Sequence, residues 1–187
     1  MNKLLQKFTP ENTTPLEQIR AKVLVATCLA VGGAILVTLL YWILFSWLEQ
    51  WLTVVIGLIF VLFLAGLVAL VKRGRVRAVA WTLTFFLVLL NLANMASYGI
   101  GTTSSAGFLL VIVLAAFTLD PRLGLGMAVL GSVAAFGIAL AGASGALQTE
   151  IPFQESNLSF DALTLTLIYL LVGLMCAVGL GNNRSAV

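Results

Sequence analysis

The chain has 187 residues, of which 61% are hydrophobic and 9% are charged, whereas an ordinary soluble domain carries about 25% charged residues. The formal net charge is +3, from ten Lys and Arg against seven Asp and Glu. This composition excludes a typical water-soluble protein, and the cations form no basic stripe with interleaved aromatic residues, as a nucleic-acid-binding surface would. We therefore expect an integral membrane protein in contact with lipid and no nucleic-acid partner.

The first element expected is a helix that begins ahead of the membrane. In the segment Thr14-Pro15-Leu16-Glu17, Thr14 suits the N-cap, Pro15 the first helical position and Glu17 the acidic position of a capping box. The helix is predicted to begin near Pro15 and to continue into the first apolar run. Residues 1–22 are interpreted as an N-terminal segment on the cytoplasmic side.

Six apolar runs follow, and each is a candidate transmembrane helix, because a helix needs about 20 apolar residues to cross the hydrocarbon core. In the fourth run the mainly apolar part is only 106–119, so its polar start is expected either to complete the helix or to form a loop that dips into the outer leaflet. The predicted fold is an all-α bundle of six transmembrane helices within residues 23–181. The runs are 23–47, 51–71, 78–98, 102–119, 123–143 and 160–180.

The basic residues predict the orientation, because cytoplasmic loops keep an excess of Lys and Arg. With six crossings, all ten fall on one side of the membrane. Both termini are then cytoplasmic, including the tail at 182–187, and the membrane is expected to be the bacterial cytoplasmic (inner) membrane. The basic residues are Lys3, Lys7, Arg20, Lys22, Lys72, Arg73, Arg75, Arg77, Arg122 and Arg184.

Small residues recur at intervals of four in three of the runs, a pattern typical of close helix packing in lipid. The fifth run has them on more than one face, so we expect it at the centre of the bundle, whereas the second run is expected to face lipid. We see no repeat between the two halves of the chain, which disfavours an inverted-repeat transporter. The stripes are Gly124, Ala128, Ser132 and Gly131, Ala135, Ala139, Ala143 in the fifth run, Ala26, Ala30, Ala34 in the first, and Gly173, Ala177, Gly181 in the sixth.

A polar face on the third run is the main candidate site. Asn91, Asn94 and Tyr98 follow one another at helical spacing, close to Thr102, Thr103 and Ser104 at the start of the fourth run. The group is expected either to bind a small polar ligand from outside or, the interpretation we favour, to join helices through hydrogen bonds. The nearby Gly99, Gly101 and Gly107 are interpreted as turn formers.

Two polar turns are expected on the cytoplasmic side. The residues Lys72, Arg73, Arg75 and Arg77 either anchor the topology, which we favour, or bind anionic lipid headgroups. Asp120-Pro121-Arg122 is interpreted as a tight turn without a chemical role.

No catalytic or metal-binding motif is evident, and we expect a non-enzyme. Histidine is absent, and the two cysteines, Cys28 and Cys176, lie in apolar runs. Apart from Asp161 at an outer end, the spans also carry no charged residue, whereas pumps and proton-coupled carriers usually place ionisable groups there. We expect no metal and predict no cofactor, while an apolar groove for a lipid, quinone or carotenoid stays open.

Part of the sequence resembles a known kind of module. The stretch KRGRVRAVAWTLTFFLVLLNLANMASYGIGTTSSAGF, followed by LDPRLGLGMAVL, is similar to the six-helix N-terminal membrane regions of bacterial histidine kinases and diguanylate cyclases. That resemblance implies a sensory input or scaffolding role. After the sixth run, however, the sequence has only 182–187, with no output domain, so the chain is expected to signal through a partner, to be a fragment or to serve as a structural subunit.

Three functions are consistent with these features. The first is an accessory or scaffold subunit that packs against other membrane subunits. The second is a sensor module that binds a small ligand or lipid in the pocket around Asn91, and the weakest is a channel or carrier for small solutes.

Overall fold

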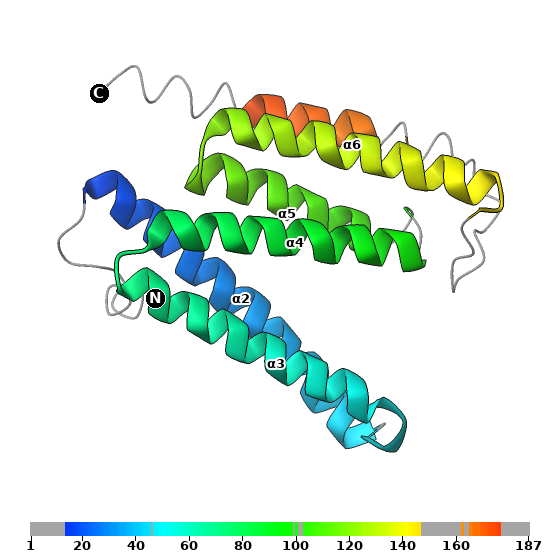
Figure 1. The fold of residues 1–187 in the computed structure, drawn as a ribbon, viewed down its shortest axis with the longest axis horizontal. Coiled ribbons are helices and arrows are strands. Elements are labelled where there is room, and N and C mark those ends of the chain that lie inside the picture. The colour runs from blue at the N-terminus through cyan, green and yellow to red at the C-terminus, as the bar shows by residue number, and fades with distance from the viewer. Residues whose placement is uncertain are drawn as a thin grey trace. The chain divides into compact units, whose positions relative to one another are not determined.

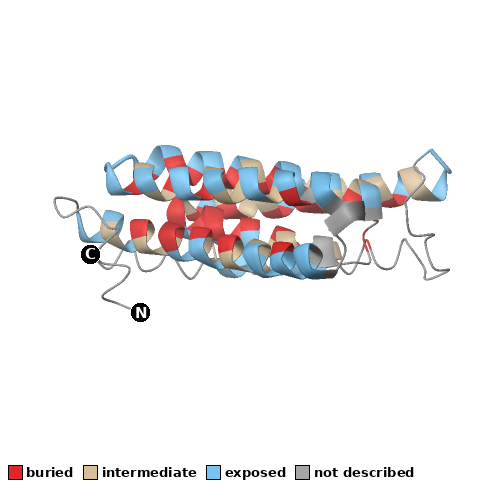
Figure 2. Ribbon diagram, turned by 90° about the horizontal axis from the view of Figure 1, so that it is seen from below, coloured by how far each residue is buried: buried red, intermediate tan, exposed pale blue. Residues whose placement is uncertain are grey.

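The computed structural model describes residues 14–45, 47–98, 100, 103–146, 162 and 165–176. Every regular element among these residues is a helix, which agrees with the all-α prediction. The chain divides into two compact units, Met1–Val79 and Ala80–Val187, and each is described by itself. Buried and exposed residues alternate along the helices, so each helix has a packed face and an open face (Figure 2).

The first unit is a hairpin of two long helices, α2 (Pro15–Phe45) and α3 (Trp47–Lys72), followed by the first turn of α4 (Val76–Tyr98). The backbone N–H of Glu17 donates to Oγ1 of Thr14 at 3.4 Å, so α2 begins at Pro15 as predicted. With 31 residues, α2 is about 46 Å long. It begins eight residues before the apolar run that starts at Val23.

The hairpin is antiparallel with a defined register. A side chain built at Gly32 of α2 would contact Leu64 of α3, and one built at Gly57 of α3 would contact Leu39 of α2. Moving seven residues forward along α2 thus moves the contact seven residues back along α3. The two helices lie side by side along their length (Figure 1).

The small-residue stripe predicted on α2 is not the face that packs on α3. Ala26, Ala30 and Ala34 are exposed, whereas Cys28 and Leu39 are buried. The physical reason is that α3 packs on the opposite side of the helix: at about 100° per residue, Cys28, Gly32 and Leu39 lie roughly half a turn away from Ala30. For α3 the prediction of a lipid-facing helix agrees with the structure, because only four of its described large apolar side chains are buried and several, such as Leu58, Ile59 and Leu62, are exposed.

The connection from α3 to α4 is a glycine-terminated helix end. Gly74 has a φ of +81°, a left-handed conformation that glycine adopts without steric cost. The N–H of Arg75 donates to the carbonyl of Leu70 at 3.1 Å and that of Gly74 to Val71 at 2.9 Å, the pair of hydrogen bonds found in a Schellman motif. The turn is therefore fixed by backbone geometry as well as by charge.

The second unit contains the rest of α4, then α5 (Thr103–Thr118), α6 (Pro121–Ala143) and a final helix, Leu165–Cys176. The side chain of Asp120 accepts a hydrogen bond from the N–H of Arg122, and Pro121 opens α6. The expected turn at Asp120-Pro121-Arg122 is thus the start of the helix itself. The polar residues at 103–105 belong to α5 and not to a loop.

Within the second unit α6 lies between two helices, as predicted for the fifth run. Gly124 packs against Ala116 of α5, and Ala128 packs against Gly173 of the final helix. Six of its seven predicted small residues are buried, while Ala143 at the end of α6 is exposed. Of the sixth run's small residues Gly173 is buried, and Ala177 and Gly181 lie outside the described residues.

Among the described residues, four helices are long and apolar enough to cross a membrane: Pro15–Tyr41, Val54–Lys72, Val76–Ser97 and Pro121–Ala143. They correspond to the first, second, third and fifth predicted spans and indicate a membrane protein. The described apolar helices for the fourth and sixth spans are shorter, Ala106–Thr118 and Leu165–Cys176. Six crossings with both termini inside therefore stay a prediction.

Candidate functional site

The polar face predicted on the third span is only partly described. Asn91 is buried, Asn94 is half-buried and Ser97 is exposed on α4. The side chains of Tyr98, Thr103 and Ser104, and all of Thr102, lie outside the described residues, as do Gly99 and Gly101. Among the described side chains of this polar face, Asn91 is the buried one.

Asn91 joins α4 to α5. Its Nδ2 donates to the carbonyl oxygen of Leu87 at 2.8 Å, which fixes the amide along its own helix. Its Oδ1 and Cγ occupy the space of a side chain at Gly107, where a Cβ would lie 2.9 Å from Cγ. Gly107 is thus a residue of close helix approach inside α5, and our interpretation of it as a turn former was wrong.

Other buried hydroxyls are satisfied within their own helices. Thr118 Oγ1 donates to Leu114 at 2.6 Å and Ser132 Oγ to Ala128 at 2.8 Å, each to a carbonyl four residues earlier. Such bonds satisfy a polar group without a second helix or a ligand. These two side chains therefore belong to the packed interior.

Thr84 is a further buried polar residue of α4 that was not predicted as a site residue from the sequence. Its side chain is fully buried, and no hydrogen-bond partner for Oγ1 is present in the described part of the chain. Thr84 lies seven residues before Asn91, hence on the same face of α4. That spacing was available in the sequence, but a single threonine in an apolar run gives little signal, because threonine usually bonds to its own helix.

An aromatic contact joins three helices of the second unit. The rings of Phe108 on α5 and Tyr169 on the final helix have centroids 5.8 Å apart, in a tilted arrangement. A Cβ at Gly131 of α6 would lie 2.7 Å from Phe108 and 3.1 Å from Tyr169. The absence of a side chain at Gly131 lets both rings approach the backbone of α6, where buried aromatic pairs add to stability.

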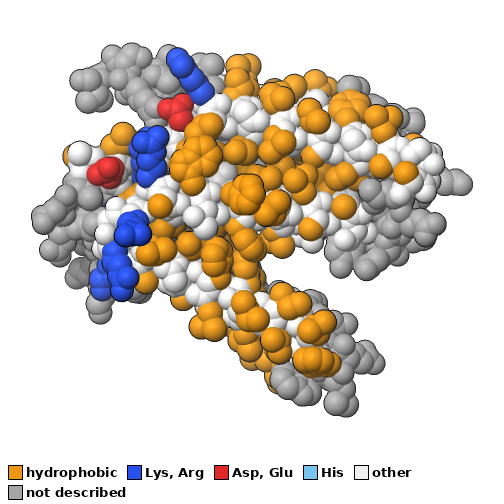
Figure 3. Space-filling model, viewed as in Figure 1, with side chains coloured by type: hydrophobic (Ala, Val, Ile, Leu, Met, Phe, Trp, Pro, Cys, Tyr) orange, Lys and Arg blue, Asp and Glu red, His pale blue; other side chains and the backbone are white. Residues whose placement is uncertain are grey.

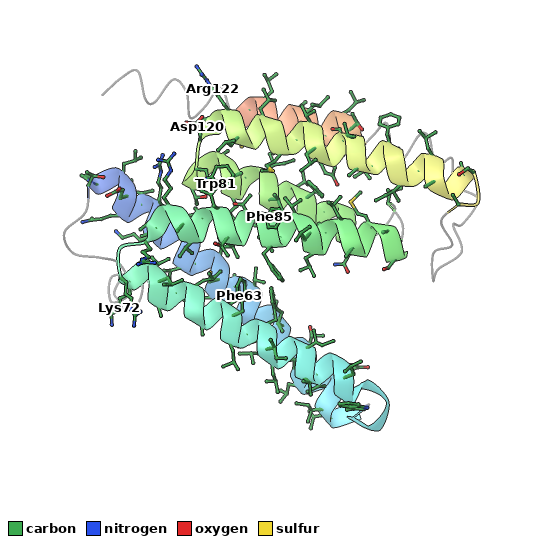
Figure 4. The ribbon with its side chains drawn as sticks, in the orientation of Figure 1. Phe63, Lys72, Trp81, Phe85, Asp120 and Arg122 are labelled. Atoms are coloured by element: carbon green, nitrogen blue, oxygen red, sulfur yellow. The ribbon has the colours of Figure 1, made fainter. Side chains whose placement is uncertain are left out.

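The four basic residues of the α3–α4 turn are all exposed. In the first unit Lys and Arg gather at one end of the hairpin, and apolar side chains occupy much of the rest of its visible described surface (Figure 3). Figure 4 shows Lys72 at the end of α3, and Asp120 and Arg122 at the start of α6. The basic turn is thus available to a ligand from solvent or from a membrane surface.

Among the described residues, no group of three or more His, Cys, Asp or Glu side chains could hold a metal ion. Cys28 is buried and Cys176 is half-buried, both as free thiols. The two cysteines belong to different units.

Comparison with known proteins gives no relative. The chain matches no protein-family model, no curated protein and no solved structure. The resemblance to the membrane regions of sensor proteins therefore stays a prediction. The structure shows a helical protein in whose described part four helices are long and apolar enough to span a membrane.

Proposed function

We propose that this chain is a non-enzymatic membrane module that acts as an accessory or scaffold subunit, packing against another membrane protein. One observation carries the proposal: Ala26, Ala30 and Ala34 form an exposed stripe on α2. They lie on the face of α2 opposite the one that packs on α3.

Small residues at four-residue spacing favour a helix partner over lipid. Lipid chains accommodate large apolar side chains as well as small ones, whereas close approach of two helix backbones requires small ones. Larger exposed side chains, such as Leu29, Leu36 and Leu40, lie along one flank of this stripe. The alanine stripe is therefore a shallow strip suited to another helix.

The position of Asn91 supports scaffolding over ligand sensing. Its amide nitrogen is bonded to Leu87, and its oxygen lies against Gly107. A ligand that used this amide would have to replace a helix contact. If the chain is a sensor, its ligand site lies at the polar residues that follow the described part of α4.

The proposal includes a topology: six crossings, both termini on the cytoplasmic side and insertion in a bacterial inner membrane. It is supported by the placement of all ten basic residues on one side when six spans are counted. A membrane-impermeant thiol reagent would test it in a background with Cys28→Ser and Cys176→Ser. Ser144→Cys, after α6, should react in intact cells, and Leu16→Cys, at the start of α2, only after permeabilisation. The reverse result would overturn the topology.

Purification of the full chain in a mild detergent tests the scaffold function. We expect another membrane subunit to co-purify in a fixed ratio. Ala30→Leu should reduce that ratio, because its side chain holds the two helix backbones apart, whereas Leu36→Trp on the lipid-facing flank should leave it unchanged. A chain that purifies alone, or a ratio that Ala30→Leu does not change, would rule out this interface.

A further inference from the structure

The register of the α2–α3 hairpin brings basic residues from two distant segments to one level. Gly32 lies level with Leu64. Ten residues before Gly32 is Lys22, and ten residues after Leu64 is Gly74. Arg20 precedes Lys22 by two residues and therefore lies about 200° away around α2, on its other flank.

Lys22 of α2 thus lies beside the basic residues of the turn, and together they form one group, here called the cationic end. Its members are half-buried on α2 and exposed in the turn and at the start of α4. Among the described side chains of this unit, Glu17 is the only carboxylate. The cationic end consists of Lys22, Lys72, Arg73, Arg75 and Arg77.

The depth of these cations matches that of lipid phosphates. Lys22 directly precedes the apolar run of α2, and Lys72 directly follows that of α3. In a membrane both would lie where the hydrocarbon region ends and the headgroups begin. The apolar sides of the hairpin then lie along the acyl chains, which distinguishes this end from a site for a free anion in water.

We propose that the cationic end is a binding site for the phosphate headgroup of an anionic phospholipid. Topological anchoring needs only a net excess of positive charge on one side, and it makes no use of the register that pairs α2 with the turn. A headgroup site requires that register, because the phosphate is shared between cations of both segments. Each basic residue near an anionic headgroup is worth enough to change affinity about fivefold.

Native mass spectrometry of the full chain, purified in a neutral detergent and titrated with short-chain phosphatidylglycerol, tests the site. Phosphatidylcholine, which is zwitterionic and has no net charge, is the lipid comparison, and inorganic pyrophosphate is the soluble one. We expect selective binding of phosphatidylglycerol, weakened about fivefold by Lys22→Gln and by Lys72→Gln. Lys22→Arg and Lys72→Arg, which keep the charge, should bind as the unchanged chain does.

Arg122→Gln, a matched loss of one exposed cation in the other unit, should leave the affinity unchanged. Equal weakening by Arg122→Gln would show a response to net charge alone and would overturn the site. No effect of Lys22→Gln beside a loss in Lys72→Gln would overturn the sharing between α2 and the turn. Binding of pyrophosphate as tight as that of phosphatidylglycerol would assign the site to a free anion. These outcomes are independent of whether a protein subunit co-purifies.

Discussion

The amide of Asn91 on α4 occupies the space that a side chain at Gly107 on α5 would need. Asn91 has little room to withdraw, because its Nδ2 is held by the carbonyl of Leu87 and the residue is buried. The amide of Asn91 therefore reaches the backbone of α5 only because Gly107 has no Cβ.

Gly107→Ala should lower the free energy of unfolding by about 1–3 kcal/mol, the usual cost of overpacking. Thermal unfolding in detergent, followed by the loss of helical circular dichroism, measures the effect. Gly137→Ala on α6 is the matched control: a Cβ there meets nothing within 4 Å, so the change should be neutral or stabilising by up to about 1 kcal/mol.

The contact itself is tested by a double substitution. Asn91→Ala removes the amide from the space at Gly107, so Gly107→Ala should cost less in that background than in the unchanged chain. Equal costs in the two backgrounds would mean that the residues are not coupled.

Gly124→Ala should separate α5 from α6. A Cβ at Gly124 would lie 2.6 Å from Cβ of Ala116 and 3.1 Å from the backbone oxygen of Ile112, and a backbone atom cannot rotate away. We expect a loss of about 1–3 kcal/mol in the free energy of unfolding, measured in the same assay. Gly126→Ala, two residues away with open space around its Cβ, should cause no loss; if both variants lost the same stability, the close approach at Gly124 would not be its cause.

Gly74→Ala should destabilise the α3–α4 connection by about 1–2 kcal/mol, because a left-handed backbone conformation brings Cβ close to the following carbonyl. Gly74→Asn should cost less, since asparagine tolerates that conformation better. The free energy of unfolding is compared with that of Gly66→Ala, whose Cβ meets nothing within 4 Å. Equal stability of Gly74→Ala and the unchanged chain would be inconsistent with the positive φ.

Asp120→Ala should cost about 0.5–2 kcal/mol, the usual value for loss of an N-cap. The carboxylate of Asp120 accepts the N–H of Arg122 at 2.9 Å, and alanine has no acceptor to replace it. Asp120→Asn keeps an oxygen acceptor and should retain most of the stability. If the asparagine variant were as unstable as the alanine variant, the negative charge and not the cap would be the stabilising feature.

Sequence predicted best the features that depend on one segment at a time. The start of α2 at Pro15 and the buried small residues of α6 follow from capping chemistry and from helical spacing. The sequence did not predict which side of α2 packs on α3, because spacing shows that Ala26, Ala30 and Ala34 share a face but not which face α3 covers. The partner of Asn91 was equally hidden: Gly107 is a single glycine near a polar turn, and only the approach of α4 to α5 gives it a role.

The length of α5 has a consequence for the surrounding bilayer. Its 16 residues extend about 24 Å, against a hydrocarbon thickness of about 30 Å. If these 16 residues alone cross the membrane, the hydrophobic mismatch of about 6 Å is met by local thinning of the bilayer, by snorkelling of flanking side chains or by association with other helices. Each response has a modest cost that increases with the thickness of the membrane, so a thin bilayer would favour insertion of the second unit.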